Sequence, residues 1–130
     1  MSSVRGLAEV VLWVHDMEAS LAFYRDLLGL PVISPPERAN PIFLQAGAGA
    51  AGIPAMVVLV RLPADAPPFG MPRPLHHLAL AVAADEFDGL RARLEGSGRA
   101  IRTGQHPVIP SRTLYTDDPD GNEVEFICPA

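Results

Sequence analysis

The sequence predicts an α+β fold built from two copies of one βαβββ module. Short apolar, β-branched segments bounded by proline and glycine clusters predict strands. Two amphipathic patterns predict one helix after the first strand of each half. Because the elements follow the same order in both halves, we expect an internal repeat. The 130 residues predict one domain, 1–130, with module one at about 7–62, a linker at 63–74 and module two at about 75–128.

The first module opens with a strand, because Glu9–Val14 is almost entirely apolar and β-branched. A helix begins at Asp16 or Glu18, continues with apolar residues at helical spacing, and ends before Gly29. The glycines and proline of Gly47–Pro54 predict a break in regular structure. The further expected strands of this half are Val32–Ser34, Ile42–Gln45 and Ala55–Leu62.

The second module repeats this order. His77–Val82 predicts its first strand, and Asp85 is expected to cap a helix that carries Phe87, Leu90 and Leu94 on one face. The prolines of the preceding linker exclude a central strand there. The further expected strands are Ala100–Thr103, Arg112–Thr116 and Glu123–Cys128.

Composition excludes several classes of function. The net charge is −5, so nucleic acid, which is bound through lysine and arginine, is not an expected partner. All ten basic residues are arginines, which excludes every chemistry that needs a lysine. Since Cys128 is the single cysteine, no disulfide can form within the chain. No signal-like start or long apolar run is present, so we expect a cytoplasmic protein with no membrane partner.

His77 is the first candidate site residue. In a strand at His77–Val82 the bulky side chains point one way, under the helix, whereas His77 shares the other face with two alanines that leave room for a ligand. The alternative is that His77 ends the strand in solvent. Alternation places His76 on the opposite face, so we expect one histidine of the pair to serve the site.

Two carboxylates are candidate partners of His77. Glu125 lies within a strand, where a buried charge needs a cation or hydrogen bonds, unless this is an edge strand with solvated carboxylates. The repeat makes Glu9 the equivalent of His77. If the modules are related by a pseudo-twofold axis, Glu9, His77 and Glu125 converge. One imidazole and two carboxylates suit Fe, Mn, Ni, Zn or Co, with the identity of the metal left open.

Three stretches carry a family resemblance. They read VHDMEASLAFYRDLLGL at 14–30, HLALAV at 77–82 and LYTDDPDGNEVEF at 114–126. In these the chain resembles the vicinal oxygen chelate superfamily, which includes glyoxalase I, extradiol dioxygenases and bleomycin-binding proteins. The resemblance implies an incomplete, cup-shaped barrel and a metal-dependent lyase, isomerase or dioxygenase. In the family the metal chelates two neighbouring oxygens of a small substrate, stabilising an enolate or activating O₂.

The resemblance also assigns roles to residues. It implies metal ligands at Glu9, near Val58 or Val60, at His77 and at Glu125. The sequence departs from this pattern twice, because Glu9 stands in place of the usual histidine and the second position lies in an apolar run.

Further site residues come from the resemblance and from side-chain type. The resemblance implies that Tyr115 and His106 are proton donors and that Arg112 contacts substrate. From the residues alone, Tyr115 suits a cavity or the core equally well, whereas a lone loop histidine such as His106 is solvated more often than catalytic. Trp13 and Phe43 are candidate apolar walls of the substrate site, or, for Trp13, a core residue under the helix.

Two expectations concern the kind of protein. The alternative to an enzyme is a metal-free protein of the bleomycin-resistance type that binds a small molecule, which the altered ligand positions favour. Open sheet edges must be paired or covered, and family members of this length commonly dimerise, so we expect a homodimer.

Overall fold

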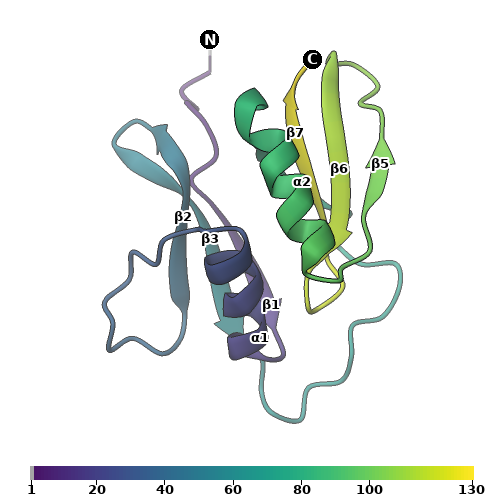
Figure 1. The fold of residues 1–130 in the computed structure, drawn as a ribbon. Helices are drawn as coiled ribbons and strands as arrows, with labels where there is room; N and C mark the ends of the chain where they lie inside the picture. The colour runs from purple at the N-terminus through teal and green to yellow at the C-terminus, as the bar shows by residue number, and fades with distance from the viewer. Residues whose placement is uncertain (1) are drawn as a thin grey trace. The chain divides into compact units, whose positions relative to one another are not determined.

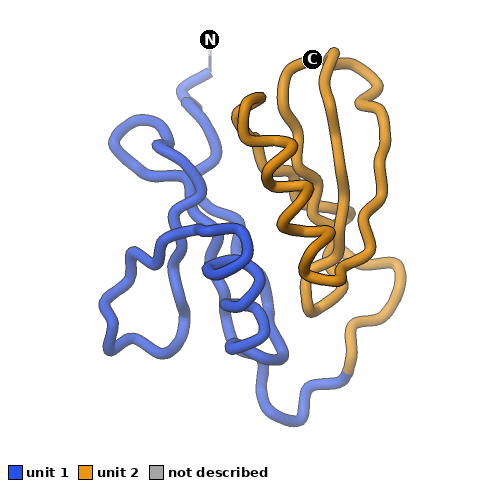
Figure 2. Tube along the Cα trace, viewed as in Figure 1, with its two compact units in different colours: residues 1–67 blue, residues 68–130 orange. Residues whose placement is uncertain are grey.

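A computed structural model describes residues 2–130 of the chain, drawn as a ribbon in Figure 1. The chain divides into two compact units, unit 1 up to Pro67 and unit 2 from Pro68 to Ala130 (Figure 2). The division falls inside the expected linker at 63–74. Each unit contains its own open sheet and its own helix, and each is described here by itself.

Unit 1 is a three-stranded sheet with a short helix. Its elements are β1 (Glu9–Val14), α1 (Met17–Leu21), a π-helical turn (Ala22–Leu27), β2 (Ile42–Ala50) and β3 (Ile53–Arg61). The strand order is β1-β3-β2, with β1 parallel and β2 antiparallel to β3. Asp16 caps the helix, because its side chain accepts a hydrogen bond from the Ala19 N–H at 3.1 Å. Gly29, at φ 78°, follows the helical segment as expected.

Two expectations for unit 1 were wrong. Gly47–Pro54 does not break the sheet but forms the tip of the β2–β3 hairpin, because Ala51 and Gly52 adopt the positive φ values that a tight two-residue turn requires. Shifts in the β2–β3 register absorb the extra glycines. The expected strand Val32–Ser34 is reduced to a single bridge between Val32 and Leu44.

Unit 2 consists of a four-stranded sheet and a helix longer than that of unit 1. Its elements are β4 (Leu78–Ala81), a 3₁₀ turn (Ala84–Glu86), α2 (Phe87–Gly96), β5 (Arg102–Gly104), β6 (Ser111–Asp117) and β7 (Glu123–Pro129). The order is β4-β7-β6-β5, with β4 parallel to β7 and the other pairs antiparallel. Asp85 does not cap the helix as expected. It lies inside the 3₁₀ turn, so α2 begins two residues later, after Glu86.

The strand orders confirm the α+β prediction and show the repeat directly. β1, β3 and β2 of unit 1 take the places of β4, β7 and β6 of unit 2, and the Val32 bridge stands where β5 does. The register extends the comparison to single residues. Val11 pairs with Val58, and the equivalent pair in unit 2 is Ala79 with Glu125. Val58 is therefore the counterpart of Glu125.

One face of each sheet is closed by apolar packing. On β1 the buried residues are Leu12 and Val14. On β7 they are Val124, Phe126 and Cys128. Phe87, Leu90 and Leu94 of α2 are buried as predicted. Since strand residues alternate between faces, the other face of each sheet is left for a site. Within residues 2–130, no helix is long and apolar enough to cross a membrane.

Candidate functional site

The structure brings His77 and Glu125 together. Glu125 lies in the middle of β7, flanked in register by Ala79 of β4 and Tyr115 of β6. His77 directly precedes β4, and its Nε2 lies 3.0 Å from Oε1 of Glu125. The short alanine beside Glu125 leaves space into which the imidazole extends. This contact is the centre of the candidate site.

The carboxylate of Glu125 is buried, with 3% of the residue exposed. While Oε1 contacts His77, the other oxygen, Oε2, is buried and finds no hydrogen-bond partner within residues 2–130. Leaving a buried carboxylate oxygen unpaired is costly, and native proteins usually satisfy such a group. Glu125 is therefore arranged to meet a cation or a donor group of a ligand.

Tyr115 lies on the same sheet face as Glu125. Its ring centroid is 6.4 Å from that of His77. Burial raises the pKa of the Tyr115 phenol, and the Glu125 carboxylate raises it further, whereas a hydrogen bond with Thr113 acts in the opposite direction. The phenol is consequently protonated at neutral pH and can donate a proton or a hydrogen bond. Tyr115 therefore lies beside His77 and Glu125, and its predicted role as a proton donor stays a prediction.

His106 lies in the loop between β5 and β6 and stabilises that loop. Its Nδ1 lies 3.1 Å from the N–H nitrogen of Val108 and 2.9 Å from that of Ile109, and both groups donate to it. Nδ1 therefore serves this loop as a hydrogen-bond acceptor. The contacts of His106 are thus those of a loop residue, and its predicted role as a proton donor stays a prediction.

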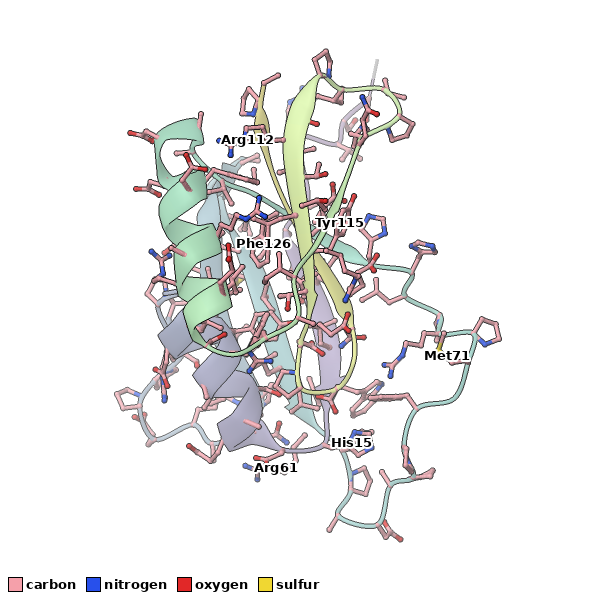
Figure 3. The ribbon with its side chains drawn as sticks, turned by 45° about the vertical axis from the view of Figure 1, so that its right-hand side comes forward. His15, Arg61, Met71, Arg112, Tyr115 and Phe126 are labelled. Carbon is pink, nitrogen blue, oxygen red and sulfur yellow. The ribbon has the colours of Figure 1, made fainter. Side chains whose placement is uncertain are left out.

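Arg112 lies on the opposite face of β6 from Tyr115 (Figure 3). Its Nη2 is 2.7 Å from Oδ1 of Asp88, and its guanidinium lies 4.4 Å from the centre of the Phe87 ring, both on α2. These contacts place the guanidinium of Arg112 on the α2 face of β6, and its predicted substrate contact stays a prediction. Residues three apart on a strand point to opposite faces, so alternation places Arg112 and Tyr115 on different faces.

Unit 1 presents its own open face. Glu9 and Trp13 are exposed on the same face of β1, and 54% of Trp13 is accessible, so the core alternative for Trp13 was wrong. Phe43 lines a pocket of about 300 Å³ together with Arg38 and Met56. Met56 is also the register partner of Glu9, so this pocket adjoins the candidate ligand within unit 1.

Two residues that the sequence reasoning missed belong to the surroundings of His77. His76 does not point away from it, because the Nδ1 atoms of His76 and His77 are 2.8 Å apart. Both precede β4, so the alternation of a strand does not govern them. Glu123, at the start of β7, lies with both histidines, and the ligand atoms of the three are within 4.8 Å of one another. The adjacent histidines and the Glu-x-Glu spacing are the signals that could have indicated this group.

A family model identifies the class of protein. Residues 6–126 match the model of the Glyoxalase/Bleomycin resistance protein/Dioxygenase superfamily. The chain therefore belongs to this superfamily, as the resemblance of its three motif stretches implies. The superfamily includes both dioxygenases and lyases.

Individual relatives span several functions. The chain is 34% identical over 117 residues to a catechol-2,3-dioxygenase of Bacillus subtilis (strain 168); the match covers 88% of this chain but 38% of the relative. A glyoxalase/dioxygenase from Nostoc punctiforme has a similar fold, with TM-score 0.74, 24% identity and coverage of 98% and 93% of the two chains. So does TnmS3, an antibiotic-binding protein from Streptomyces sp. CB03234, with TM-score 0.65, 22% identity and full coverage of both chains.

Proposed function

We propose that this protein is a metal-dependent enzyme that acts on a small substrate with two neighbouring oxygen atoms. The observation that carries the proposal is the buried Glu125, with one oxygen on His77 and the other unpaired. A nitrogen and an oxygen 3.0 Å apart have the spacing of two neighbouring ligands of one divalent ion. The donor types suit Fe, Mn, Co, Ni or Zn.

The proposed ligands in unit 2 are His77 and Glu125. Glu9, which occupies in unit 1 the position of His77, stays a predicted ligand. The equivalent of Glu125 is the buried Val58, which offers no donor atom. The two ligands from unit 2 leave coordination positions for a substrate.

The residues around this site supply binding and proton transfer. A divalent metal held there would supply Lewis-acid stabilisation of negative charge on the substrate oxygens. The Tyr115 phenol, protonated at neutral pH, donates a hydrogen bond or a proton to a substrate atom above β6. The catechol dioxygenase relative supports a catechol as the first substrate to test.

A second candidate is a metal-free binding protein. The observation that favours it is the buried valine at position 58, together with the exposed apolar Val11 and Trp13 on β1. Such a surface suits an apolar drug or metabolite, and TnmS3 supports this alternative at the level of the fold.

Metal binding that depends on both Glu125 and Glu9 decides between the two candidates. The untagged protein is purified, its metals are measured by elemental analysis, and Mn, Fe and Zn binding is then followed by calorimetry. We expect one equivalent of metal in the wild type, and binding at least about 10-fold weaker in Glu125→Gln and in Glu9→Gln. Glu95→Gln is the matched control, because it removes a carboxylate from the exposed surface of α2. Unchanged binding in Glu125→Gln would exclude the proposed site.

We also propose that the protein is a homodimer. β1 and β2 are the edges of the sheet in unit 1, and β1 carries the exposed Val11 and Trp13. Exposed apolar groups at a sheet edge favour association. Light scattering should return twice the chain mass of 13.9 kDa, and a monomer mass at micromolar concentration would exclude this.

A further inference from the structure

His77 presents its two ring nitrogens to two different groups. Nε2 lies 3.0 Å from Oε1 of Glu125, whereas Nδ1 lies 2.8 Å from Nδ1 of His76. A neutral imidazole carries a proton on one nitrogen and a lone pair on the other. When Nε2–H donates to Glu125, the lone pair on Nδ1 therefore faces His76.

Glu123 completes this second group. β4 and β7 are parallel, and Leu78 pairs with Val124, so the residue before each, His77 and Glu123, follow the same register. His76, His77 and Glu123 each offer one ligand atom, and these atoms lie within 4.8 Å of one another. Two imidazoles and a carboxylate form a common donor set for Zn²⁺ and other divalent transition metals.

We infer that His76, His77 and Glu123 form a second divalent-metal site, the outer site, distinct from the proposed site of His77 and Glu125. In the outer site Nδ1 of each histidine and one oxygen of Glu123 hold the ion. Glu125 then accepts the Nε2–H of His77, which is the usual arrangement behind a metal-binding histidine. Ligands about 2.0–2.3 Å from one ion lie closer together than 4.8 Å, so the three side chains must move slightly inward, and both histidines are exposed.

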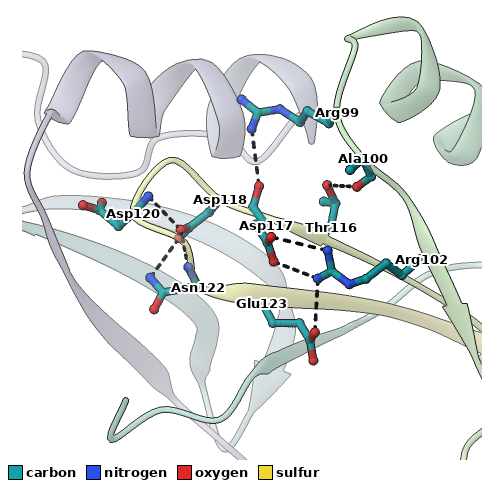
Figure 4. Close-up of polar contacts among 9 residues, drawn as sticks. All are labelled: Arg99, Ala100, Arg102, Thr116, Asp117, Asp118, Asp120, Asn122 and Glu123. Atoms are coloured by element: carbon teal, nitrogen blue, oxygen red, sulfur yellow. Dashed lines mark hydrogen bonds and ion pairs between the residues drawn. The ribbon is translucent and has the colours of Figure 1, made fainter. Parts of the chain in front are cut away.

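Charged side chains surround Glu123 and hold its carboxylate in place. Arg102 lies 3.1 Å from Oε2 of Glu123 and 2.7 Å from Oδ1 of Asp117 (Figure 4). Arg73 lines the same pocket as His76 and Glu123. Within the pocket the guanidinium groups of Arg73 and Arg102 therefore stand against the carboxylates of Asp117 and Glu123. Arg102 also orients Glu123, since it binds one oxygen and leaves the other for a metal.

The pocket beside these residues gives the ion room for further ligands. It has a volume of about 500 Å³, and its walls include His76 and Glu123. Water or a small anion can therefore complete the coordination of an ion that has three protein ligands.

The two sites compete for one side chain. A metal at the proposed catalytic site, here called the inner site, needs the lone pair of His77 on Nε2. The outer site needs that lone pair on Nδ1. A neutral ring cannot provide both, so occupation of the outer site excludes the inner one. Excess Zn²⁺ should consequently inhibit an enzyme that works through the inner site.

The experiment identifies the nitrogen that binds. Metal-stripped, untagged protein is titrated with Zn²⁺ alone, and the histidine side chains are followed by ¹⁵N NMR, which distinguishes Nδ1 from Nε2. We expect a coordination shift at Nδ1 of both His76 and His77. His76→Gln and Glu123→Gln should each weaken Zn²⁺ binding at least about 10-fold and remove the Nδ1 shift, while Glu95→Gln should change neither.

Glu125→Gln separates this inference from the proposed function. If the outer site exists, this variant still binds Zn²⁺ through Nδ1, about 10–100-fold more weakly because the acceptor of the Nε2–H is altered. Zinc bound through Nε2 of His77, lost in Glu125→Gln and unaffected by His76→Gln, would overturn the outer site and support the inner one. The absence of Zn²⁺ binding to the wild type would overturn the outer site as well.

Discussion

Val58 and Glu125 occupy the same place in the two halves of the repeat, yet one is a buried valine and the other a buried carboxylate. Val58 pairs with Val11 of β1, and Glu125 pairs with Ala79 of β4. Both residues are almost fully buried, at 2% and 3% exposure. The fold is thus repeated while the chemistry is not, and the buried charge of the pair belongs to unit 2 alone.

The Tyr115 phenol is expected to ionise above pH 10. Burial and the Glu125 carboxylate raise its pKa in the folded state, so the folded protein holds this proton more tightly than the unfolded chain. The free energy of unfolding should accordingly fall as the pH rises above the unfolded pKa, until Tyr115 ionises in the folded state. Below that range this contribution is constant.

The measurement is an absorbance titration of the phenolate. The difference between the wild type and Tyr115→Phe isolates Tyr115 from Tyr24, which is the other tyrosine of the chain. A difference curve with its midpoint below pH 10 would contradict the burial of the phenol against Glu125.

Gly104→Ala should displace the Tyr115 ring. A Cβ at position 104 would lie 2.9 Å from Cε1 of Tyr115, which is closer than carbon atoms pack. Forcing an extra methyl group against a packed ring typically costs about 1–3 kcal/mol of stability. Because the displaced phenol becomes more hydrated, its pKa should fall toward the usual value.

Chemical denaturation measures the first effect of Gly104→Ala, and the same absorbance titration measures the second. Gly89→Ala is the control, because a Cβ there meets nothing within 4 Å. A Tyr115 titration identical in Gly104→Ala and the wild type would show that the glycine does not position the ring.

Gly49→Ala should destabilise the β2–β3 hairpin strongly. Gly49 has φ 79°, and a Cβ there would clash with the backbone of Ile53, Pro54 and Ala55. Gly52 has nearly the same φ, 81°, but open space around its Cβ position. Gly52→Ala should therefore cost only the backbone strain, about 1–2 kcal/mol, and Gly49→Ala clearly more.

Urea denaturation compares the two glycine variants. The midpoints should fall in the order wild type, Gly52→Ala, Gly49→Ala, with similar dependence on urea concentration. Equal midpoints for the two variants would show that the hairpin relaxes around the added methyl group.

Arg112→Gln should leave metal and substrate binding unchanged. The guanidinium contacts Asp88 and Phe87 of α2, on the face of β6 opposite Tyr115. Zn²⁺ affinity and, once a substrate is known, KM are the measurements, and Tyr115→Phe is the comparison that should change KM or kcat. A raised KM in Arg112→Gln would mean that the substrate reaches the α2 face.

The strand alternation of β7 and the position of the helices were predictable from the sequence, because local periodicity determines them. The buried face of Val124 and Phe126 and the α2 residues Phe87, Leu90 and Leu94 follow directly from their spacing. The same periodicity put Glu125 on the face away from α2. Glycine positions were less informative, since Gly47–Pro54 continues the sheet through a turn whose bulges depend on pairing with β3.

By itself the sequence determined the repeat, the α+β fold and the choice of His77 and Glu125, because each depends on the order and type of neighbouring residues. The tertiary structure decided which groups meet across strands. Residues 76 and 77 are adjacent in the chain, but only the β4–β7 register brings them to Glu123 and Glu125, 46 and more residues away. Likewise Arg112 contacts α2 rather than Tyr115, because the carboxylate of Asp88 forms an ion pair with its guanidinium. Register and side-chain pairing arise from long-range contacts, and those contacts exist only in the folded chain.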